Sequence, residues 1–426
     1  MKRNKIYILL IAIVLSMNIN AQTGINSPYS RYGLGQLYSE NLNTISMSMG
    51  GISLGIHNST AINPANPASY GSLDSLAFIF EIGVIGNTTT LKTNQLSENG
   101  YDATLSYIFA GFPITRWWRA GVGVMPYSKI GYNVEVTVEV PNFSNVVHSF
   151  TGDGGLNQVF FGNGFNIKKN LRLGVDVSFL FGQSERSSMV YYPDSVFILG
   201  TKVESKVRGG DFLLDYGLQY DINLNNTTQA TIGITYANKF NLKAKRNYLS
   251  KTISGGFDDQ VEVVKDTIEY IPDEKGTIVV PQRFGIGFAV NKEDRWLVGA
   301  DFEWQNWKEF GAFNVSDTLS NSFRVAVGGE FRPPHTNISS LFKRISYRAG
   351  IRYSQSYLNF NGTNINEFGI SFGFGFPMKK SKTEIDLGFE FGRRGTTNDN
   401  LVQENFINFF LGISIKEHWF QKRKYK

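Results

Sequence analysis

Charged side chains at alternating positions are the residues of this sequence that could do chemistry. They lie in segments where every second residue is apolar, so each charge shares a face with other polar residues or with glycine. Because an unpaired buried charge is costly, we expect most of them to form a paired network. A sharper hypothesis is that some bind the carboxylate head group of a ligand. The candidates, of both signs, are Arg172, Asp176, Asp215, Asp301, Glu303, Arg324, Arg348, Arg352, Glu384, Asp386 and Glu390.

Other catalytic or metal-binding groups are poorly represented. The chain has no cysteine, which excludes disulfides and thiolate metal sites. Its four histidines, His57, His148, His335 and His418, fall in separate regions without the spacing of a metal site. There is no nucleophile elbow and no phosphate-binding loop. We therefore expect no enzymatic activity, no cofactor and no metal.

The basic isoelectric point, about 9.1, arises at the two ends of the chain. Residues 1–21 hold Lys2, Arg3 and Lys5 and no acid, and residues 421–426 hold four further cations. The remainder is balanced, with 35 Lys and Arg residues against 36 Asp and Glu residues. A nucleic-acid-binding protein needs a basic face on its folded body. The sequence predicts no nucleic-acid partner.

Residues 1–21 have the pattern of a secretory signal peptide. The basic residues precede an apolar run from Ile6 to Leu15, and Ile19 and Ala21 occupy the −3 and −1 positions of a cleavage site before Gln22. The run is too short to span a bilayer as a helix. We expect an exported protein that is held in the membrane by neither a helix nor a lipid anchor.

Alternation of period two recurs along residues 76–420 and predicts long strands with two chemically different faces. One segment places Phe368, Ile370, Phe372, Phe374 and Phe376 opposite Gly369, Ser371, Gly373 and Gly375. Such segments reach the 9–11 residues or so that a membrane-spanning strand needs. A face of glycine and mixed charge opposite an apolar face is typical of an outer-membrane barrel.

The count of alternating segments is fourteen, and short connections mostly follow the even-numbered strands, as periplasmic turns would. We predict an all-β, fourteen-strand antiparallel transmembrane barrel over residues 76–420, integral to the outer membrane of a Gram-negative cell and in contact with its lipid. Residues 421–426 would form a basic periplasmic tail. All six tryptophans lie near predicted strand ends, where aromatic girdles are expected: Trp117, Trp118, Trp296, Trp304, Trp307 and Trp419.

Residues 22–75 do not alternate and are rich in Asn, Ser and Gly. Their apolar content exceeds that of a disordered leader, which is the alternative. Prolines in the run Asn63, Pro64, Ala65, Asn66, Pro67 and Ala68 make it rigid and non-repetitive. A fourteen-strand barrel has a wide interior that must hold water or be occupied. We predict that residues 22–75 form a plug in the lumen, with Arg31 as a candidate partner for the charges of the wall.

The Asn63–Ala68 element, placed before fourteen strands, resembles the long-chain fatty-acid transporter family of outer-membrane proteins. The run from Ser27 to Gly35 and the Trp419-Phe420 end with its basic tail resemble Bacteroidetes members. The resemblance implies passive uptake of small hydrophobic molecules past the plug and out through a lateral opening at a kinked strand. It also implies an alternative, because some relatives are non-transporting accessory barrels of outer-membrane secretion or protein-assembly complexes. The glycine and charge of this wall, in place of an apolar pocket, weaken transport of a long-chain lipid and strengthen the structural role. We nevertheless predict the transporter-like function, with the accessory subunit as the alternative.

The candidate for the kink is Pro126, with Met125 before it and Gly131 five residues later. Proline removes a ladder hydrogen bond and is confined to sheet edges, bulges and strand ends. We predict either a lateral opening at 125–131 or the point where this strand leaves the membrane. A separate acidic insertion, which includes Asp258, Asp259, Glu262, Asp266 and Glu269, lacks the spacing of a calcium loop. It predicts a solvated hairpin or a surface for an envelope protein partner.

Overall fold

The structure is a computed structural model that describes residues 27–38, 42–141, 145–193, 198–254, 262–292, 295–316, 318–334, 340–378 and 383–418. The predicted signal peptide and basic tail, Trp419, Asp258, Asp259 and His335 lie outside these ranges. Among the described residues, no helix is long and apolar enough to cross a bilayer.

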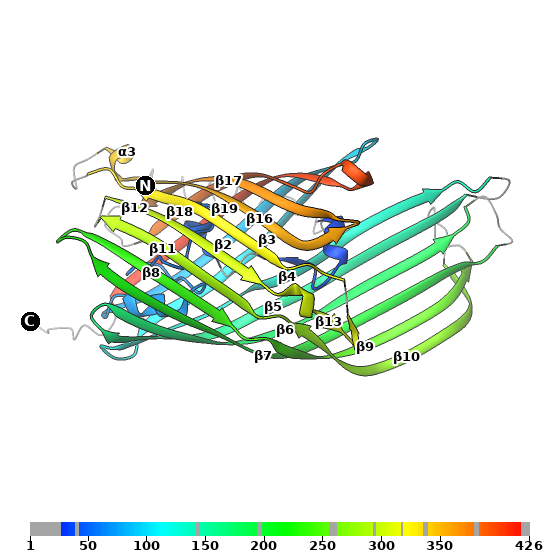
Figure 1. The fold of residues 1–426 in the computed structure, drawn as a ribbon, viewed down its shortest axis with the longest axis horizontal. Coiled ribbons are helices and arrows are strands. Elements are labelled where there is room, and N and C mark those ends of the chain that lie inside the picture. Colours follow the sequence, from blue (N-terminus) through cyan, green and yellow to red (C-terminus); the bar gives the residue numbers. More distant parts are fainter. Residues whose placement is uncertain are drawn as a thin grey trace, which may run out of the picture.

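Fourteen antiparallel strands form a closed barrel (Figure 1), which confirms the predicted fold class. Closure is made by the last strand and the first, which pair from Gln403↔Lys92 to His418↔Ala77. The wall strands are β2 (Ala77–Lys92), β3 (Ser97–Pro113), β4 (Trp118–Val138), β5 (Val146–Lys168), β6 (Leu171–Tyr191), β7 (Gly200–Asn223), β8 (Thr228–Ala237), β11 (Arg283–Lys292), β12 (Trp296–Gln305), β15 (Ser322–Phe331), β16 (Ser346–Phe360), β17 (Thr363–Pro377), β18 (Glu384–Arg394) and β19 (Gln403–His418).

The barrel has its apolar side chains on the outside. Along β17, Phe368, Ile370, Phe372 and Phe374 are exposed, whereas the intervening Gly369, Ser371 and Gly373 are buried. A water-soluble sandwich would bury the apolar set. The exposure pattern therefore matches a wall that faces lipid and encloses a polar interior.

The two ends of the barrel differ. At one end the connections are mostly short, such as 114–117 and 224–227. At the other end several strands extend well beyond the rest (Figure 1). There β9 (Phe240–Ser254) and β10 (Val263–Val280) continue the lines of β8 and β11, and β9 pairs with β7 from Gly200↔Ile253 to Gly209↔Ala244. Some expected loops are strand instead: β16 and β17 are joined by Asn361 and Gly362, both at positive φ, as a tight hairpin requires.

The tryptophans follow the predicted girdle only in part. Trp117 and Trp118 lie at the β3–β4 turn, and Trp296 and Trp304 lie near the two ends of β12. Trp307 is an exception, because it is fully buried in the 3₁₀ helix η4 (Trp307–Glu309) and stacks on Tyr357 with ring centroids 4.3 Å apart. In the sequence it lies just after a strand end, but the loop between β12 and β15 folds back, with the short strands β13 (Gly311–Ala312) and β14 (Val315–Ser316).

The segment before β2 consists of short pieces, each begun by a polar cap. Ser27 caps the 3₁₀ helix η1 (Pro28–Arg31), Asn43 caps α2 (Thr44–Met47) and Asn66 caps the 3₁₀ helix η3 (Pro67–Ser72). Between η1 and α2 lies β1 (Gln36–Leu37). The caps satisfy N–H groups that such short helices cannot satisfy internally. Proline at the first turns of η1 and η3 costs no hydrogen bond.

Glycines of the wall allow this N-terminal segment to lie directly against the strands. A β-carbon at Gly233 of β8 would lie 1.9 Å from the carbonyl oxygen of Leu54, and one at Gly174 of β6 would lie 2.2 Å from the carbonyl carbon of Pro67. Farther round the wall, a β-carbon at Gly328 of β15 would lie 2.1 Å from the carbonyl oxygen of Met49. Backbone therefore contacts backbone on several sides of the interior.

These contacts predict that Gly233→Val displaces the N-terminal segment, because the added side chain overlaps the backbone at Leu54. We expect a loss of about 1–3 kcal/mol of stability and faster proteolysis within residues 42–75. Gly86→Val is the matched control, since a β-carbon at Gly86 meets no atom within 4 Å. Limited proteolysis of the folded barrels measures the difference. Equal cleavage of the two variants would contradict the prediction.

Candidate functional site: the interior of the barrel

The N-terminal segment is held to the wall by buried hydrogen bonds to its backbone. Asp301 of β12 accepts bonds from the N–H groups of Ser53 (2.6 Å) and Leu54 (2.9 Å). Glu81 of β2 accepts one from the N–H of Ile62 at 2.7 Å. Further wall side chains that bond this backbone come from other sides of the barrel: Tyr107, Arg119, Asn166, Arg186, Gln219, Arg324, Tyr357 and Ser371.

The Asn-Pro-Ala element organises the centre of this segment. Asn63 donates from Nδ2 to the carbonyl oxygens of Ser53 (2.7 Å) and Ile56 (3.0 Å). Asn66 accepts from the N–H of Ala68 at 3.1 Å and donates to Leu54 at 2.8 Å and to Leu218 of β7 at 3.3 Å. Pro64, Ala65, Pro67 and Ala68 are buried beside them. Both asparagines therefore tie non-repetitive backbone together where prolines have removed donors.

Two ion-pair clusters are each centred on an arginine of β16, and together they are called the ion-pair network here. Arg348 pairs with Glu330 (2.6 Å), with Glu384 (3.1 Å) and with Asp386. Arg352 pairs with Glu390 at 2.5 Å and with Glu367, and Glu367 also contacts Arg394 at 2.5 Å. Arg394 reaches Glu404 of β19, which accepts a hydrogen bond from the hydroxyl of Ser27. The network thus runs from the wall into the N-terminal segment.

The other predicted charges have various partners. Arg172 binds Asp221 through both guanidinium Nη atoms, at 2.6 and 2.7 Å, and Arg324 binds Glu303. Asp176 accepts from the hydroxyl of Tyr70 in η3 at 3.1 Å, and Asp215 pairs with Arg283 at 3.0 Å. Sequence reasoning missed several participants: Glu81, Asp221, Arg283, Glu330, Glu367, Arg394 and Glu404. All of them lie on wall strands or at their ends, so an extension of the inward-facing register would have found most of them.

Arg31 is placed differently from the expectation. Its guanidinium lies over the ring of Phe150, 3.6 Å from the centroid. Within the described residues it makes no ion pair with a carboxylate of the wall. The segment's polar contact with the network is made by Ser27 instead. Cation–π contact suits a guanidinium at the end of the barrel where the strands are longest.

The wall is interrupted between β3 and β4, next to the predicted kink. Their pairing runs from Pro113↔Arg119 to Ile108↔Val124, although β4 continues to pair with β5 as far as Val138. Pro126 lies at a register shift in that second ladder. The strand therefore does not end at Pro126, and the described parts of β3 and β4 separate just before it.

Strand β1 occupies the space where β3 no longer pairs with β4. It pairs with β4 at Gln36↔Lys129 and Leu37↔Ser128. The carbonyl oxygen of Gly131 accepts from the N–H of Ser27 at 3.1 Å, and Met125 packs in the buried cluster with Phe109 and Phe160. An ion pair of 2.5 Å between Lys129 and Asp102 joins β4 to β3.

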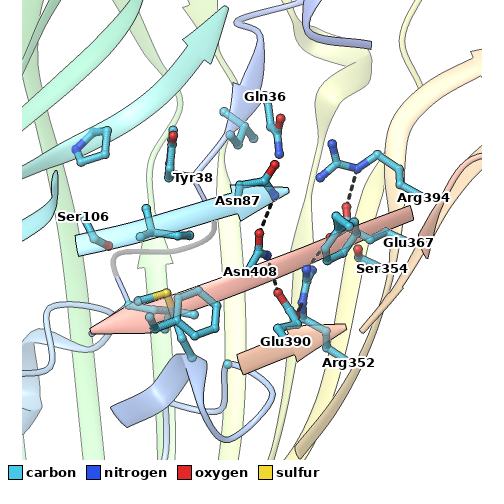
Figure 2. Close-up of a pocket in the computed structure, with 18 of the residues that line it drawn as sticks. Gln36, Tyr38, Asn87, Ser106, Arg352, Ser354, Glu367, Glu390, Arg394 and Asn408 are labelled. Carbon is cyan, nitrogen blue, oxygen red and sulfur yellow. Dashed lines mark hydrogen bonds and ion pairs between the residues drawn. The ribbon is translucent and has the colours of Figure 1, made fainter. Parts of the chain in front are cut away.

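Two cavities flank β1 inside the barrel. The larger, about 210 Å³, is bounded by β1, Pro126 and the ion-pair network (Figure 2). There Asn87 donates to Asn408 at 2.5 Å, and Asn408 donates to Glu390 at 2.8 Å. The second, about 170 Å³, lies toward Trp304 and Tyr357. Both linings mix apolar side chains with charges that are already paired.

Metal binding depends on how the histidines and acids of the described residues are grouped. No group of three or more His, Asp or Glu side chains there could hold a metal ion. His57 lies 3.4 Å from Asp221 and 3.4 Å from the hydroxyl of Thr231. Burial lowers the pKa of His57, and the hydrogen bond to Asp221 opposes that shift. Burial likewise raises the pKa of Tyr70.

The network predicts that Arg348→Met is strongly destabilising, because Glu330, Glu384 and Asp386 lose a shared buried cation. Breaking a buried pair typically costs about 3–5 kcal/mol. The control is Lys206→Met, whose pair with Glu185 has side chains 47% and 55% exposed and contributes under about 1 kcal/mol. Urea unfolding of both variants in the same detergent measures the two costs. Similar losses would argue against a structural role for the network.

Solved structures of similar fold include a hydrocarbon channel and a toluene transporter. The structure resembles the CymD monoaromatic hydrocarbon channel (TM-score 0.60, 13% identity, covering 90% of this chain and 99% of that one). It also resembles the Ralstonia pickettii toluene transporter TbuX (TM-score 0.59, 15% identity, covering 89% of this chain and 100% of that one). A Pseudomonas aeruginosa FadL homologue is similar too (TM-score 0.59, 14% identity, covering 91% of this chain and 100% of that one). At these identities the likeness concerns the fold alone.

Sequence comparison gives the family. A search of curated proteins finds no match to the chain. The family model described as BamG, however, matches residues 1–426, which is the whole chain. The protein therefore belongs to the BamG family.

Proposed function

We propose that this protein is a non-transporting accessory barrel of an outer-membrane protein-assembly or secretion complex in a Gram-negative cell. Residues 22–75 act as a fixed plug, and the barrel serves as a membrane-embedded scaffold for other envelope proteins. Membership of the BamG family favours this function over the transport function that the resemblance to fatty-acid transporters also implies.

The observation that carries the proposal is the immobilised interior. The plug is bonded through its backbone to buried side chains of strands on all sides, including Asp301, Glu81 and Gln219. Moving it would leave these groups unsatisfied, at about 1–3 kcal/mol each. A conduit needs an apolar passage, whereas the cavities of this interior are lined partly by paired charges and are separated by backbone that lies against wall glycines.

A scaffold also needs a surface that its partners can use. Strand β10 is exposed along most of its length, and its described residues pair with β9 on one edge but on the other edge only with β13, at Ile278 and Val279. Ile268 and Tyr270 are 60% and 61% exposed. Such apolar side chains, on a strand that leaves one edge open, suit contact with another protein. The acidic residues Glu262, Asp273 and Glu274 mainly pair with cations of β7 and β9, which makes this extension rigid.

The proposal predicts that the barrel purifies from mild detergent in stoichiometric association with other envelope proteins. The double variant Ile268→Lys and Tyr270→Lys should reduce that yield about tenfold, the effect of roughly 1.4 kcal/mol of binding energy. Leu96→Lys is the control, because Leu96 is 76% exposed at the same end of the barrel. Purification of the native barrel alone, with lipid bound in its interior, would contradict the proposal.

A second function, uptake of small hydrophobic molecules, is favoured by one observation. The larger cavity reaches Pro126 and Ser106, next to the place where β3 and β4 separate. A molecule in this cavity would reach the membrane if β1 moved away from Ser128 and Lys129. The solved structures of similar fold include a hydrocarbon channel and a toluene transporter.

The two functions differ in the effect that a crosslink between β3 and β4, where these strands separate, would have on uptake. The chain has no cysteine, so Asp102→Cys with Lys129→Cys provides a unique pair for a short bismaleimide. We expect uptake of a fluorescent fatty acid into proteoliposomes to be negligible before and after crosslinking. Uptake by the uncrosslinked barrel that the reagent abolishes would establish the transport function instead.

A further inference from the structure

The turn between β15 and β16 departs from the short connections at its end of the barrel. It contains the helix α3 (Leu341–Arg344), drawn at the end of the barrel opposite the long extensions (Figure 1). Phe342 of this helix is 73% exposed. An exposed phenyl ring in a turn forgoes the free energy of burial, so its position calls for an apolar or interfacial environment.

Aromatic side chains lie next to α3 on the outside of the barrel. Phe331 of β15 is the cross-strand neighbour of both Trp296 and Tyr347. The hydroxyl of Tyr347 donates to the carbonyl oxygen of Phe342 at 3.0 Å, which fixes α3 against the wall. Aromatic residues in such a band mark the depth at which hydrocarbon gives way to headgroups.

Cations surround the same place, one step farther from the hydrocarbon. Lys343 and Arg344 belong to α3, and Arg332 joins the next turn through a bond of 2.7 Å from its N–H to the oxygen of Arg295. Lys292 is opposite Trp296 in the β11–β12 ladder. Arg332 is already paired with Glu330. The described residues of these two turns thus supply five cations.

We infer that α3 and its neighbouring turn form a binding site for an anionic phospholipid of the inner leaflet. The aromatic band contacts the acyl chains, Phe342 inserts at the interface, and Lys343, Arg344 and Arg295 bind the phosphate. Aromatic rings beside cations suit a lipid headgroup at the interface, and cations near an anionic surface strengthen the attraction to it. The inference rests on the outer-membrane location in the proposed function, but not on the barrel having protein partners.

Titration of the purified full-length barrel with short-chain phosphatidylglycerol, in detergent with phosphatidylcholine as competitor, tests the site. Binding is followed by native mass spectrometry. The double variant Lys343→Gln and Arg344→Gln should weaken phosphatidylglycerol binding about tenfold relative to the parent. The matched control is Lys168→Gln with Lys169→Gln, two exposed cations of the β5–β6 turn at the same end, and it should bind like the parent. Heat-dependent gel mobility verifies that each variant is folded.

Each outcome decides the question. Equal losses in both double variants would show general attraction to a basic end and would overturn the site, as would no loss in either. Competition by inorganic phosphate at the same concentration as the lipid would show an anion site without lipid contacts, and would also overturn it. Photocrosslinking from position 342 to another subunit in the native complex would assign the patch to an acidic protein partner. Failure of this site leaves the scaffold proposal untouched, since that proposal is tested by co-purification.

Discussion

The contact between wall glycines and the backbone of the N-terminal segment is the constraint on which the rest of the structure depends. A barrel of this width encloses more space than its own side chains fill. Here the N-terminal segment occupies part of that space. The wall positions that contact its backbone, such as Gly174, Gly233 and Gly328, leave no room for a β-carbon. Backbone brought this close must have its donors and acceptors satisfied, and that requirement determines where the polar side chains of the wall lie.

Carboxylates of the wall meet this requirement in two ways. Asp301 and Glu81 accept hydrogen bonds from backbone N–H groups of the segment, whereas Glu330, Asp386 and Glu390 pair with arginines of β16. Both arrangements leave few uncompensated charges in the interior, and both immobilise the segment. The same interactions that stabilise the fold therefore also hold the N-terminal segment in the interior.

Period-two alternation was sufficient to predict the barrel, its strand number and the inward direction of most charges, because these follow from the two-residue repeat of a strand. The partners of these charges could not be predicted from the sequence. Asp176 and Asp215 are directly opposite in the β6–β7 ladder, yet Asp176 binds Tyr70 and Asp215 binds Arg283. Their different partners depend on the path of the N-terminal segment, which brings Tyr70 to Asp176. Arg31 and Trp307 were misjudged for the same reason, since their surroundings are made by non-repetitive chain with no periodic signal.

The gap between β3 and β4 is where the two functional interpretations meet. In a closed barrel every interrupted ladder exposes unpaired backbone groups, which hydrocarbon does not tolerate. This chain supplies β1 as a substitute partner for β4 at Ser128 and Lys129 and adds the Lys129–Asp102 ion pair. Because β1 follows the stretch Ser27–Gly35, whose backbone is bonded to Gly131, Arg186 and Tyr357, opening the gap would require loosening these contacts as well. The gap is thus more consistent with a sealed scaffold than with a gate that a small ligand could open.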